Sequence, residues 1–190
     1  MTKNGVLYTY SGTIAFPDGA PTLLDIAISL SREGRYAGAG VRFWPVALHT
    51  FVVCDMLPDK LKFDGLLHDA AESVIGDVPK PVKTAEIEEF ENYILATIYK
   101  SFGVTVPNPK EHASVKVADN YALFGEVYTV GNQALKTVLP RCVLAEEIVL
   151  KYAEKYKHKD YLEPTGKVPL EFIHRFNKYK DLLPKRRLLK

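Results

Sequence analysis

Residues 46–57 read VALHTFVVCDML, and this stretch constrains the fold most because it is apolar almost throughout. A helix that is apolar on every side must lie in a core, covered by other helices. Pro58-Asp59 ends it. One polar residue, His49, stands in its first turn. A lone histidine on an apolar helix is usually a satisfied core residue, so His49 alone is weak evidence for function.

Patterns elsewhere predict the helices that surround this one. Residues 6–16 are rich in β-branched and aromatic residues around Ser11-Gly12, which predicts two short strands and a turn, with a loop over 17–21. Thr22 and Thr84 are placed to cap two of the helices. The predicted helices cover residues 23–30, 46–57, 63–75, 85–102, about 110–130, 141–156 and 169–183. The expected fold is mainly α, a helical bundle with a small N-terminal β-hairpin.

Length and composition fit one ordinary globular domain over residues 1–190, with a core at about 22–150 and a helical extension at 151–190. The net charge of +2 gives no reason to expect nucleic acid or membrane as a partner. Cys54 and Cys142 lie in apolar helical patterns and are expected to be buried free thiols, which fits a reducing cytosol. There is no signal sequence or membrane-spanning run, so a soluble cytoplasmic protein is expected. The basic tail, 184–190, fits a contact with acidic partners or a neighbouring subunit, or a frayed solvated end, which we favour.

The stretch 66–83, LLHDAAESVIGDVPKPVK, carries the clearest functional signal. On one helix, Glu72 shares a face with His68 and Asp69. Gly76 can end that helix, and the prolines that follow prevent it from resuming. A helix gains nothing from charge beside its most apolar residues unless the cluster has a partner, and the natural partner of imidazole and carboxylates is a metal ion. A solvated face with a chance His-Asp pair is the alternative, but the whole array favours a site.

Two further residues extend this cluster. A catalytic metal site needs three or four ligands with room for water. An antiparallel helix pair can bring His49 alongside His68. Asp119, in the segment VKVAD, places a carboxylate on a half-apolar helix face, and a metal would offset the cost of burying it. The residues predicted to hold the metal are His49, His68, Asp69 and Asp119.

This pattern resembles the HD-domain metal-dependent phosphohydrolases. Residues 68–83 are most similar to one branch, which holds bacterial 5′-deoxynucleotidases and phage enzymes that hydrolyse dATP to deoxyadenosine and triphosphate. The N-terminal part, through Arg35-Tyr36, also resembles the phage members, and the likeness covers about residues 6–150. It implies that His49, His68, Asp69 and Asp119 are the metal ligands and that Glu72 and Asp77 handle the attacking water.

The same resemblance implies roles in substrate binding. Arg35 would contact the nucleotide beside the aromatic Tyr36, and Lys116 would face the phosphates. Lys80 and Lys83 could add positive charge, although lysines in a proline-rich loop are more often only solvated. Aromatic stacking on a base could also involve Phe43 or Trp44, which are more typical of a core or an interface. The chain departs from its relatives at Pro45, Val46, Ala47 and Thr50, so base or sugar recognition is expected to depend on residues 35–49.

The expected activity is metal-dependent hydrolysis of a dNTP, preferably dATP, to a deoxynucleoside and triphosphate. Release of phosphate from dNMPs is the runner-up; a non-catalytic nucleotide-binding protein and hydrolysis of cyclic or signalling nucleotides are further alternatives. Two histidines and two aspartates suit Zn, Mn, Co, Fe or Ni, with additional Mg accompanying a triphosphate substrate. The expected partners are the deoxynucleotide and further copies of the chain in a homo-oligomer. For a phage protein, the cytoplasm would be that of the host.

Overall fold

The structure, a computed structural model, describes residues 7–12, 14–16, 19–131 and 133–189 and is mainly helical. Its helices are α1 (Leu23–Arg32), α2 (Val46–Asp55), α3 (Lys62–Leu67), α4 (Glu72–Ile75), α5 (Ala85–Ser101), α6 (Pro109–Thr129), α7 (Val143–Lys155), α8 (His158–Leu162) and α9 (Lys167–Lys180). Short 3₁₀ segments are η1 (Arg35–Gly38), η2 (Asp59–Leu61), η3 (Lys80–Val82), η4 (Gln133–Thr137) and η5 (Lys185–Arg187).

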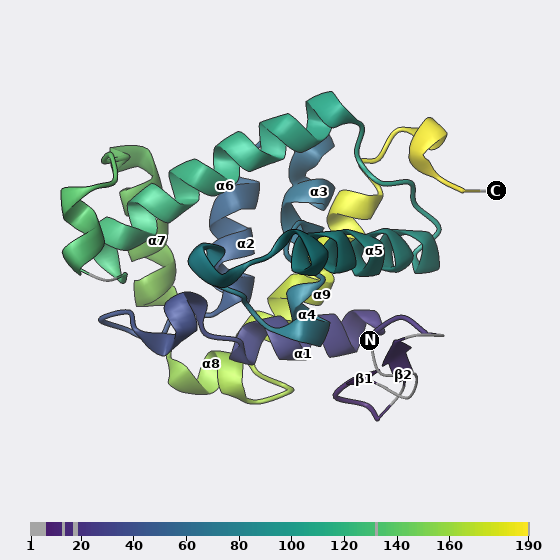
Figure 1. Cartoon of the computed structure of the whole chain (residues 1–190), viewed down its shortest axis with the longest axis horizontal. Helices are drawn as coiled ribbons and strands as arrows, with labels where there is room; N and C mark the ends of the chain where they lie inside the picture. The colour runs from purple at the N-terminus through teal and green to yellow at the C-terminus, as the bar shows by residue number, and fades with distance from the viewer. Residues whose placement is uncertain (1–6, 13, 17–18, 132, 190) are drawn as a thin grey trace.

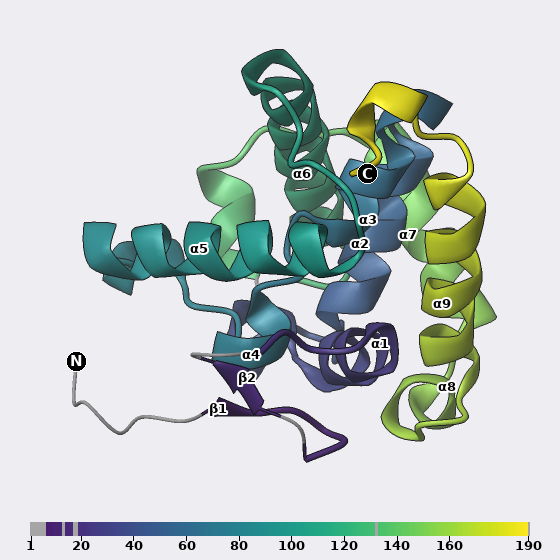
Figure 2. The same cartoon turned by 90° about the vertical axis from the view of Figure 1, so that its right-hand side faces the viewer.

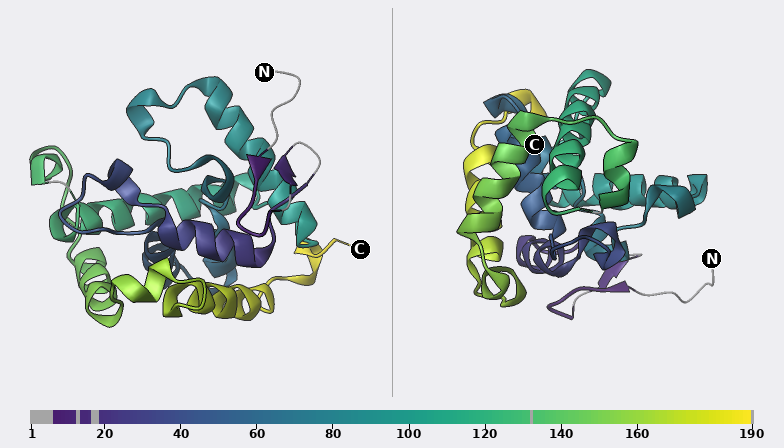
Figure 3. Two further views of the ribbon diagram at one scale, coloured as in Figure 1. Left: turned by 90° about the horizontal axis from the view of Figure 1, so that it is seen from below. Right: turned by 90° about the vertical axis from the view of Figure 1, so that its left-hand side faces the viewer.

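Helix α2 forms the centre of the core, as its apolar sequence predicts. Its residues 46–54 are all buried, and it packs against α1, α3, α6, α7 and α9. Figure 1 shows α6 running obliquely across α2 and α3, and in Figure 2 α9 lies on the opposite side of these helices from α5. The view from below in Figure 3 shows α1, α8 and α9 side by side. This packing brings together residues distant in sequence, near the start of α2, the end of α3 and the middle of α6.

Local signals explain where the principal helices begin. The side chain of Thr22 accepts a hydrogen bond from the Asp25 N–H, and the Asp25 carboxylate accepts one from the Thr22 N–H, which completes a capping box at α1. The predicted cap Thr84 accepts from the Ile87 N–H at α5. Asn108 caps α6, with Pro109 in its first turn. The predicted caps of α1 and α5 are therefore confirmed.

The helix predicted over residues 63–75 is not continuous. It divides into α3 and α4, and residues 68–71 form tight turns in which the Ala70 N–H donates to the Leu67 carbonyl and the Glu72 N–H to the Asp69 carbonyl. The cause lies in His68, whose Nδ1 donates to the Gly65 carbonyl at 2.8 Å and so occupies a main-chain acceptor. The His68-Asp69 pair consequently lies at a helix junction rather than on the face of a long helix.

The C-terminal segment belongs to the same core as the rest of the chain. Helix α9 packs against α1, α2 and α3, and beyond it Arg187 is buried. The Thr105 N–H donates to the Arg187 carbonyl, and the Leu189 N–H to the Gly103 carbonyl. Of the frayed, solvated tail that we favoured from the sequence, the fraying is wrong for residues 184–189, because the ion pair of Arg187 and main-chain hydrogen bonds hold this segment. Its residues other than Arg187 are exposed, as expected.

Two other expectations meet the structure only in part. Strands β1 (Leu7–Tyr8) and β2 (Ile14–Phe16) pair antiparallel, but residues 6, 13, 17 and 18 of the predicted hairpin and loop lie outside the described residues. Both cysteines are free; Cys54 is buried as predicted, whereas Cys142 is only half-buried. Within the described part of the chain, no helix combines the length and apolar character needed to cross a membrane.

Candidate metal centre

Three predicted ligands converge from three elements. His49 comes from α2, His68 from the junction after α3, and Asp119 from α6. One ligand atom from each lies within 4.8 Å of the others. His49 Nε2 is 3.1 Å from Asp119 Oδ1, and His68 Nε2 is 3.9 Å from the same oxygen. This spacing brings two nitrogens and one oxygen within reach of a single cation.

The fourth predicted ligand, Asp69, lies beside them. Its Oδ2 is 3.1 Å from His68 Nε2 and 3.6 Å from His49 Nε2. Burial would raise the pKa of Asp69, but the neighbouring imidazoles hold it well below its usual range. The pKa of Asp119 is lowered in the same way, against burial, by the hydrogen bond with His49 and the charge of His68. Both carboxylates are thus ionised, the form that a metal requires.

The contacts of the two ring nitrogens of His68 give an independent indication that this residue binds a metal ion. Its Nδ1 must be the protonated nitrogen, because that atom donates to the Gly65 carbonyl. Its Nε2 is buried and, although 3.1 Å from Asp69 Oδ2, makes no contact of hydrogen-bond geometry among the described residues. A buried polar atom without a partner is costly, so native structures rarely leave one. A divalent cation would satisfy Nε2, and the donor set of two imidazoles and two carboxylates fits such an ion.

A cavity of about 400 Å³ opens over this cluster. Its walls come from η1, the α3–α4 junction, the 77–83 loop, α6 and the segment around η4. Every residue predicted for catalysis or substrate binding in the α3–α6 region lines it, together with Arg35 and Tyr36. The lining residues are Arg35, Tyr36, Asp69, Glu72, Asp77, Val78, Pro79, Lys80, Pro81, Lys83, Lys116, Asp119, Asn120, Leu123, Leu135 and Leu139.

The two predicted water-handling acids lie together in this cavity. Burial, reinforced by the charges of Asp69 and Asp77, raises the pKa of Glu72 to about 10. Burial also raises the pKa of Asp77. The Asp77 N–H donates to Glu33 Oε1 at 3.1 Å, and Gly76 before it has φ +80, so this turn depends on glycine. Glu72 is therefore a protonatable group beside the metal cluster, and Asp77 is held at a fixed position.

The predicted cationic side chains differ in their exposure and in whether they already pair with an acidic side chain. Arg35 is almost buried, and its Nη1 lies 3.7 Å from Asp69 Oδ2. Lys116 is half-exposed and donates to Asp119 Oδ2. Lys83 donates to Glu91 Oε2 at 2.7 Å, whereas Lys80 is exposed. All four line the cavity, so it can receive an anionic group.

Residues 37–48 were expected from the sequence to take part in base or sugar recognition, but none of them lines the cavity. Trp44 is buried in the core, and Phe43 stacks on Tyr161 at 5.4 Å in a different hollow. Neither lines the cavity over the metal cluster. Three of the four positions at which the sequence departs from the pattern it resembles, Val46, Ala47 and Thr50, are buried in α2. The cavity is instead lined by Arg35 and Tyr36 and by residues not predicted from the sequence: Asn120, Leu123, Leu135 and Leu139.

Sequence reasoning also missed Glu126. This residue is fully buried in α6, and its Oε1 accepts a hydrogen bond from His49 Nδ1 at 2.7 Å. The signal was present, because Glu126 follows Asp119 by two helical turns and stands between the small or apolar residues Gly125 and Val127. A carboxylate in such a setting indicates a buried partner, as it did for Asp119.

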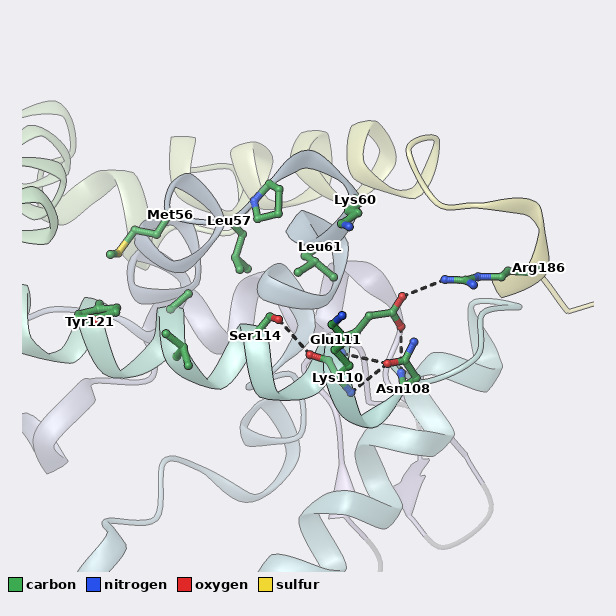
Figure 4. A pocket seen from close by; sticks show the side chains of 13 residues that line it. Met56, Leu57, Lys60, Leu61, Asn108, Lys110, Glu111, Ser114, Tyr121 and Arg186 are labelled. Carbon is green, nitrogen blue, oxygen red and sulfur yellow. Dashed lines mark hydrogen bonds and ion pairs between the residues drawn. The ribbon is translucent and has the colours of Figure 1, made fainter.

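A second, larger hollow lies on the other side of α6 (Figure 4), with a volume of about 680 Å³. Met56, Leu57 and Leu61 line one wall, and Val117 and Tyr121 of α6 line another. Its one acidic residue among the described lining residues, Glu111, is already paired with Arg186 and Arg187. The converging imidazoles and carboxylates lie beneath the other cavity, which Asp69 and Asp119 line, and that cavity is therefore the candidate site.

Comparison with known proteins gives a limited result. No model of a known protein family matches the chain. A protein of Escherichia coli (strain K12), described as uncharacterized protein YfdR, is 34% identical over 109 residues. The match covers 56% of this chain and 60% of the relative, so the chain spans less than two thirds of the relative's length. The name of this relative carries no activity.

Proposed function

We propose that this protein is a metal-dependent phosphohydrolase of the HD-domain superfamily that acts on deoxynucleotides. The observation that carries the proposal is the convergence of His49, His68 and Asp119, with Asp69 beside them, under a cavity lined with cationic side chains. Imidazole and carboxylate ligands with an adjacent open volume are what hydrolytic metal sites require. The E. coli relative neither supports nor opposes this activity.

Each group in the cavity has a role that follows from its surroundings. A divalent cation supplies Lewis acidity and lowers the pKa of water. Glu72 is suited to proton transfer, because its Oε2 is buried with no hydrogen-bond partner among the described residues and its pKa is raised to about 10. Arg35 and Lys116 would neutralise phosphate charge as the phosphorus–oxygen bond breaks. Leu123, Leu135 and Leu139 offer an apolar wall to the base or sugar.

We favour a dNTP, with dATP preferred, as the substrate, and triphosphate as the leaving product. The cavity carries four cationic side chains, Arg35, Lys80, Lys83 and Lys116, which suits a polyphosphate. The pairing of Lys83 with Glu91 and of Lys116 with Asp119 reduces their free charge, and this observation favours the runner-up, release of phosphate from a dNMP.

The deciding experiment incubates the Mn²⁺- or Co²⁺-loaded protein with a matched panel of dNMPs and dNTPs. Phosphorus NMR of the products distinguishes triphosphate from phosphate. The variant Glu72→Ala should retain the metal and lose turnover, because among the described residues the Glu72 side chain makes no hydrogen bond or ion pair with a predicted ligand, yet it lines the same cavity. Binding of nucleotides without release of any phosphate product would favour a non-catalytic nucleotide-binding protein instead.

A further inference from the structure

The side chain of Glu126 accepts four hydrogen bonds within the site. Each of its oxygens accepts two hydrogen bonds. Oε1 accepts from His49 Nδ1 at 2.7 Å and from Trp44 Nε1 at 2.9 Å. Oε2 accepts from Arg35 Nε at 3.0 Å and from the Tyr36 hydroxyl at 3.1 Å. Burial would raise the pKa of this carboxyl, but Arg35 and His49 hold it below its usual value, so Glu126 is ionised.

The two oxygens serve different groups. On the Oε1 side, His49 turns its other nitrogen, Nε2, toward Asp119 and Asp69. A carboxylate that accepts the Nδ1 proton of an imidazole fixes both the tautomer and the direction of the ring. On the Oε2 side, Arg35 and Tyr36 both line the cavity. One carboxylate therefore connects a candidate metal ligand with two candidate substrate-binding residues.

The backbone next to Arg35 is strained in a way that these contacts explain. Tyr36 has φ +60 and Ala37 has φ +49, and both are in the left-handed region. A residue other than glycine is strained there, because its Cβ approaches the following carbonyl oxygen. Such strain persists only where surrounding contacts compensate it, and it concentrates at functional sites. The Tyr36 hydroxyl and the Arg35 guanidinium both end on Glu126, which supplies the compensating contacts.

We infer that Glu126 is a positioning residue that couples the metal centre to the substrate-binding pair. Through Oε1 it holds His49 with Nε2 directed at the metal position. Through Oε2 it holds Arg35 and Tyr36 over the cavity. The second half rests on the proposed function, whereas the first half depends only on metal binding.

The positioning role of Glu126 has to be distinguished from the purely structural role that any buried carboxylate could have. Asp25 is a matched control for that structural role. It is 1% exposed, and it also accepts four hydrogen bonds, from the N–H and hydroxyl groups of Ser11 and Thr22. It does not line the cavity. Glu126→Gln and Asp25→Asn both remove a buried charge with four donors, but only the first touches a candidate ligand.

The first measurement is Co²⁺ binding to the 190-residue chain. Binding is quantified by equilibrium dialysis and by the visible absorption of the bound ion. Glu126→Gln should weaken Co²⁺ binding by roughly ten- to hundredfold and alter the absorption bands, as loss of an outer-shell carboxylate does. Asp25→Asn should lower the melting temperature without changing either readout. Wild-type affinity and spectrum in Glu126→Gln, or an equal loss in Asp25→Asn, would overturn the inference.

Trp44→Phe keeps the test decisive if Glu126→Gln does not fold. It removes one donor to Oε1 and leaves the charge of Glu126 in place, so a smaller loss of Co²⁺ affinity is expected. An unchanged affinity and spectrum would count against the inference.

The second measurement concerns Oε2. At saturating metal, Tyr36→Phe should raise the KM for the nucleotide without changing Co²⁺ affinity, whereas Trp44→Phe should change the affinity. The opposite pattern would contradict the assignment of the two oxygens. If no nucleotide is hydrolysed by the wild-type protein, the proposed function fails, and the Co²⁺ measurements still decide whether Glu126 positions His49.

Discussion

Two histidines reach the candidate metal position through the same nitrogen, and each is oriented by a different acceptor. His68 donates from Nδ1 to the Gly65 carbonyl, an acceptor three residues earlier in the chain. His49 donates from Nδ1 to Glu126, an acceptor on another helix. In both rings Nε2 is left to face Asp69 and Asp119. The local contact of His68 forms with its own helix turn, whereas that of His49 exists only when α2 and α6 pack.

Removing either member of the His68-Asp69 pair should abolish metal binding. We expect His68→Ala and Asp69→Ala to lose bound metal and activity while the fold survives, because both residues lie at a half-buried helix junction rather than in the core. Metal analysis of the purified proteins and circular dichroism measure the two quantities. His112→Ala, an exposed histidine on α6, is the control and should keep the metal. Full activity in either His68→Ala or Asp69→Ala would remove this pair from the site.

Metal affinity should depend on pH through His49. Burial and the charge of Arg35 would lower the pKa of His49, but Glu126 and Asp119 raise it to about 9. Below that pH the metal must displace a proton from the ring, so the apparent affinity should rise as pH increases, by up to about tenfold per pH unit for one proton. Titration with Co²⁺ at several pH values between 6 and 9 tests this. A constant affinity across that range would contradict metal binding by a His49 with this raised pKa.

At the scale of elements, α6 organises the site because its faces serve different neighbours. Asp119 and Lys116 face the candidate cavity, Val117 and Tyr121 face the second hollow, and Gly125 approaches α7. A Cβ on Gly125 would lie 2.5 Å from the Ala145 carbonyl carbon. The absence of a side chain there lets α6 and α7 pack closely, and the next residue, Glu126, is thereby buried.

The substitution Gly125→Ala should destabilise the protein by about 1–3 kcal/mol, since the added methyl group overlaps the α7 backbone. Helix propensity alone predicts the opposite, a gain of about 1 kcal/mol for replacing glycine within a helix. Urea unfolding measures the difference in free energy of unfolding between the variant and the wild type. The sign of that difference distinguishes the two expectations. A stabilised variant would mean that α6 and α7 are not in close contact.

Element prediction from the sequence succeeded where the signal is local. The caps Thr22 and Thr84 and the apolar run of α2 act within a few residues, so the principal helices lie close to where they were predicted. The break at residues 68–71 was not predicted, because it comes from the hydrogen bond between the His68 ring and the Gly65 carbonyl. Helical spacing cannot reveal a side chain that competes for a main-chain acceptor.

At the scale of the molecule, the chain end is joined to the middle of the fold. Arg187 forms an ion pair with Asp64 of α3, with Nη2 2.9 Å from Oδ1, and it also donates to the Thr105 carbonyl. The Tyr99 hydroxyl of α5 donates to the same carboxylate at 3.0 Å. Three segments far apart in sequence thus meet at one buried charge pair. Asp64 lies on α3, the helix that ends directly before His68. The ion pair with Arg187 therefore also holds the segment that carries His68.

Arg187→Ala should destabilise the protein by about 3–5 kcal/mol, because it leaves the buried carboxylate of Asp64 without its cation. The neighbouring Arg186, whose side chain is 71% exposed and pairs with Glu111, provides the control. Arg186→Ala should change the stability by about 1 kcal/mol or less. Thermal and chemical unfolding of both variants provide the comparison. Equal stabilities for the two would mean that the C-terminal segment does not hold α3.

The sequence by itself determined the approximate positions of the longer helices, the central place of α2 and four residues able to ligate a metal, because caps, apolar periodicity and unusual polar residues are local properties. The tertiary structure decided which of these residues meet. It brought His49, His68 and Asp119 within reach of one ion, added Glu126 as the carboxylate that orients His49, and excluded Phe43 and Trp44 from the cavity. It also buried Arg187. These facts depend on packing between helices distant along the chain, and a pattern within one helix does not record which neighbour that helix will have.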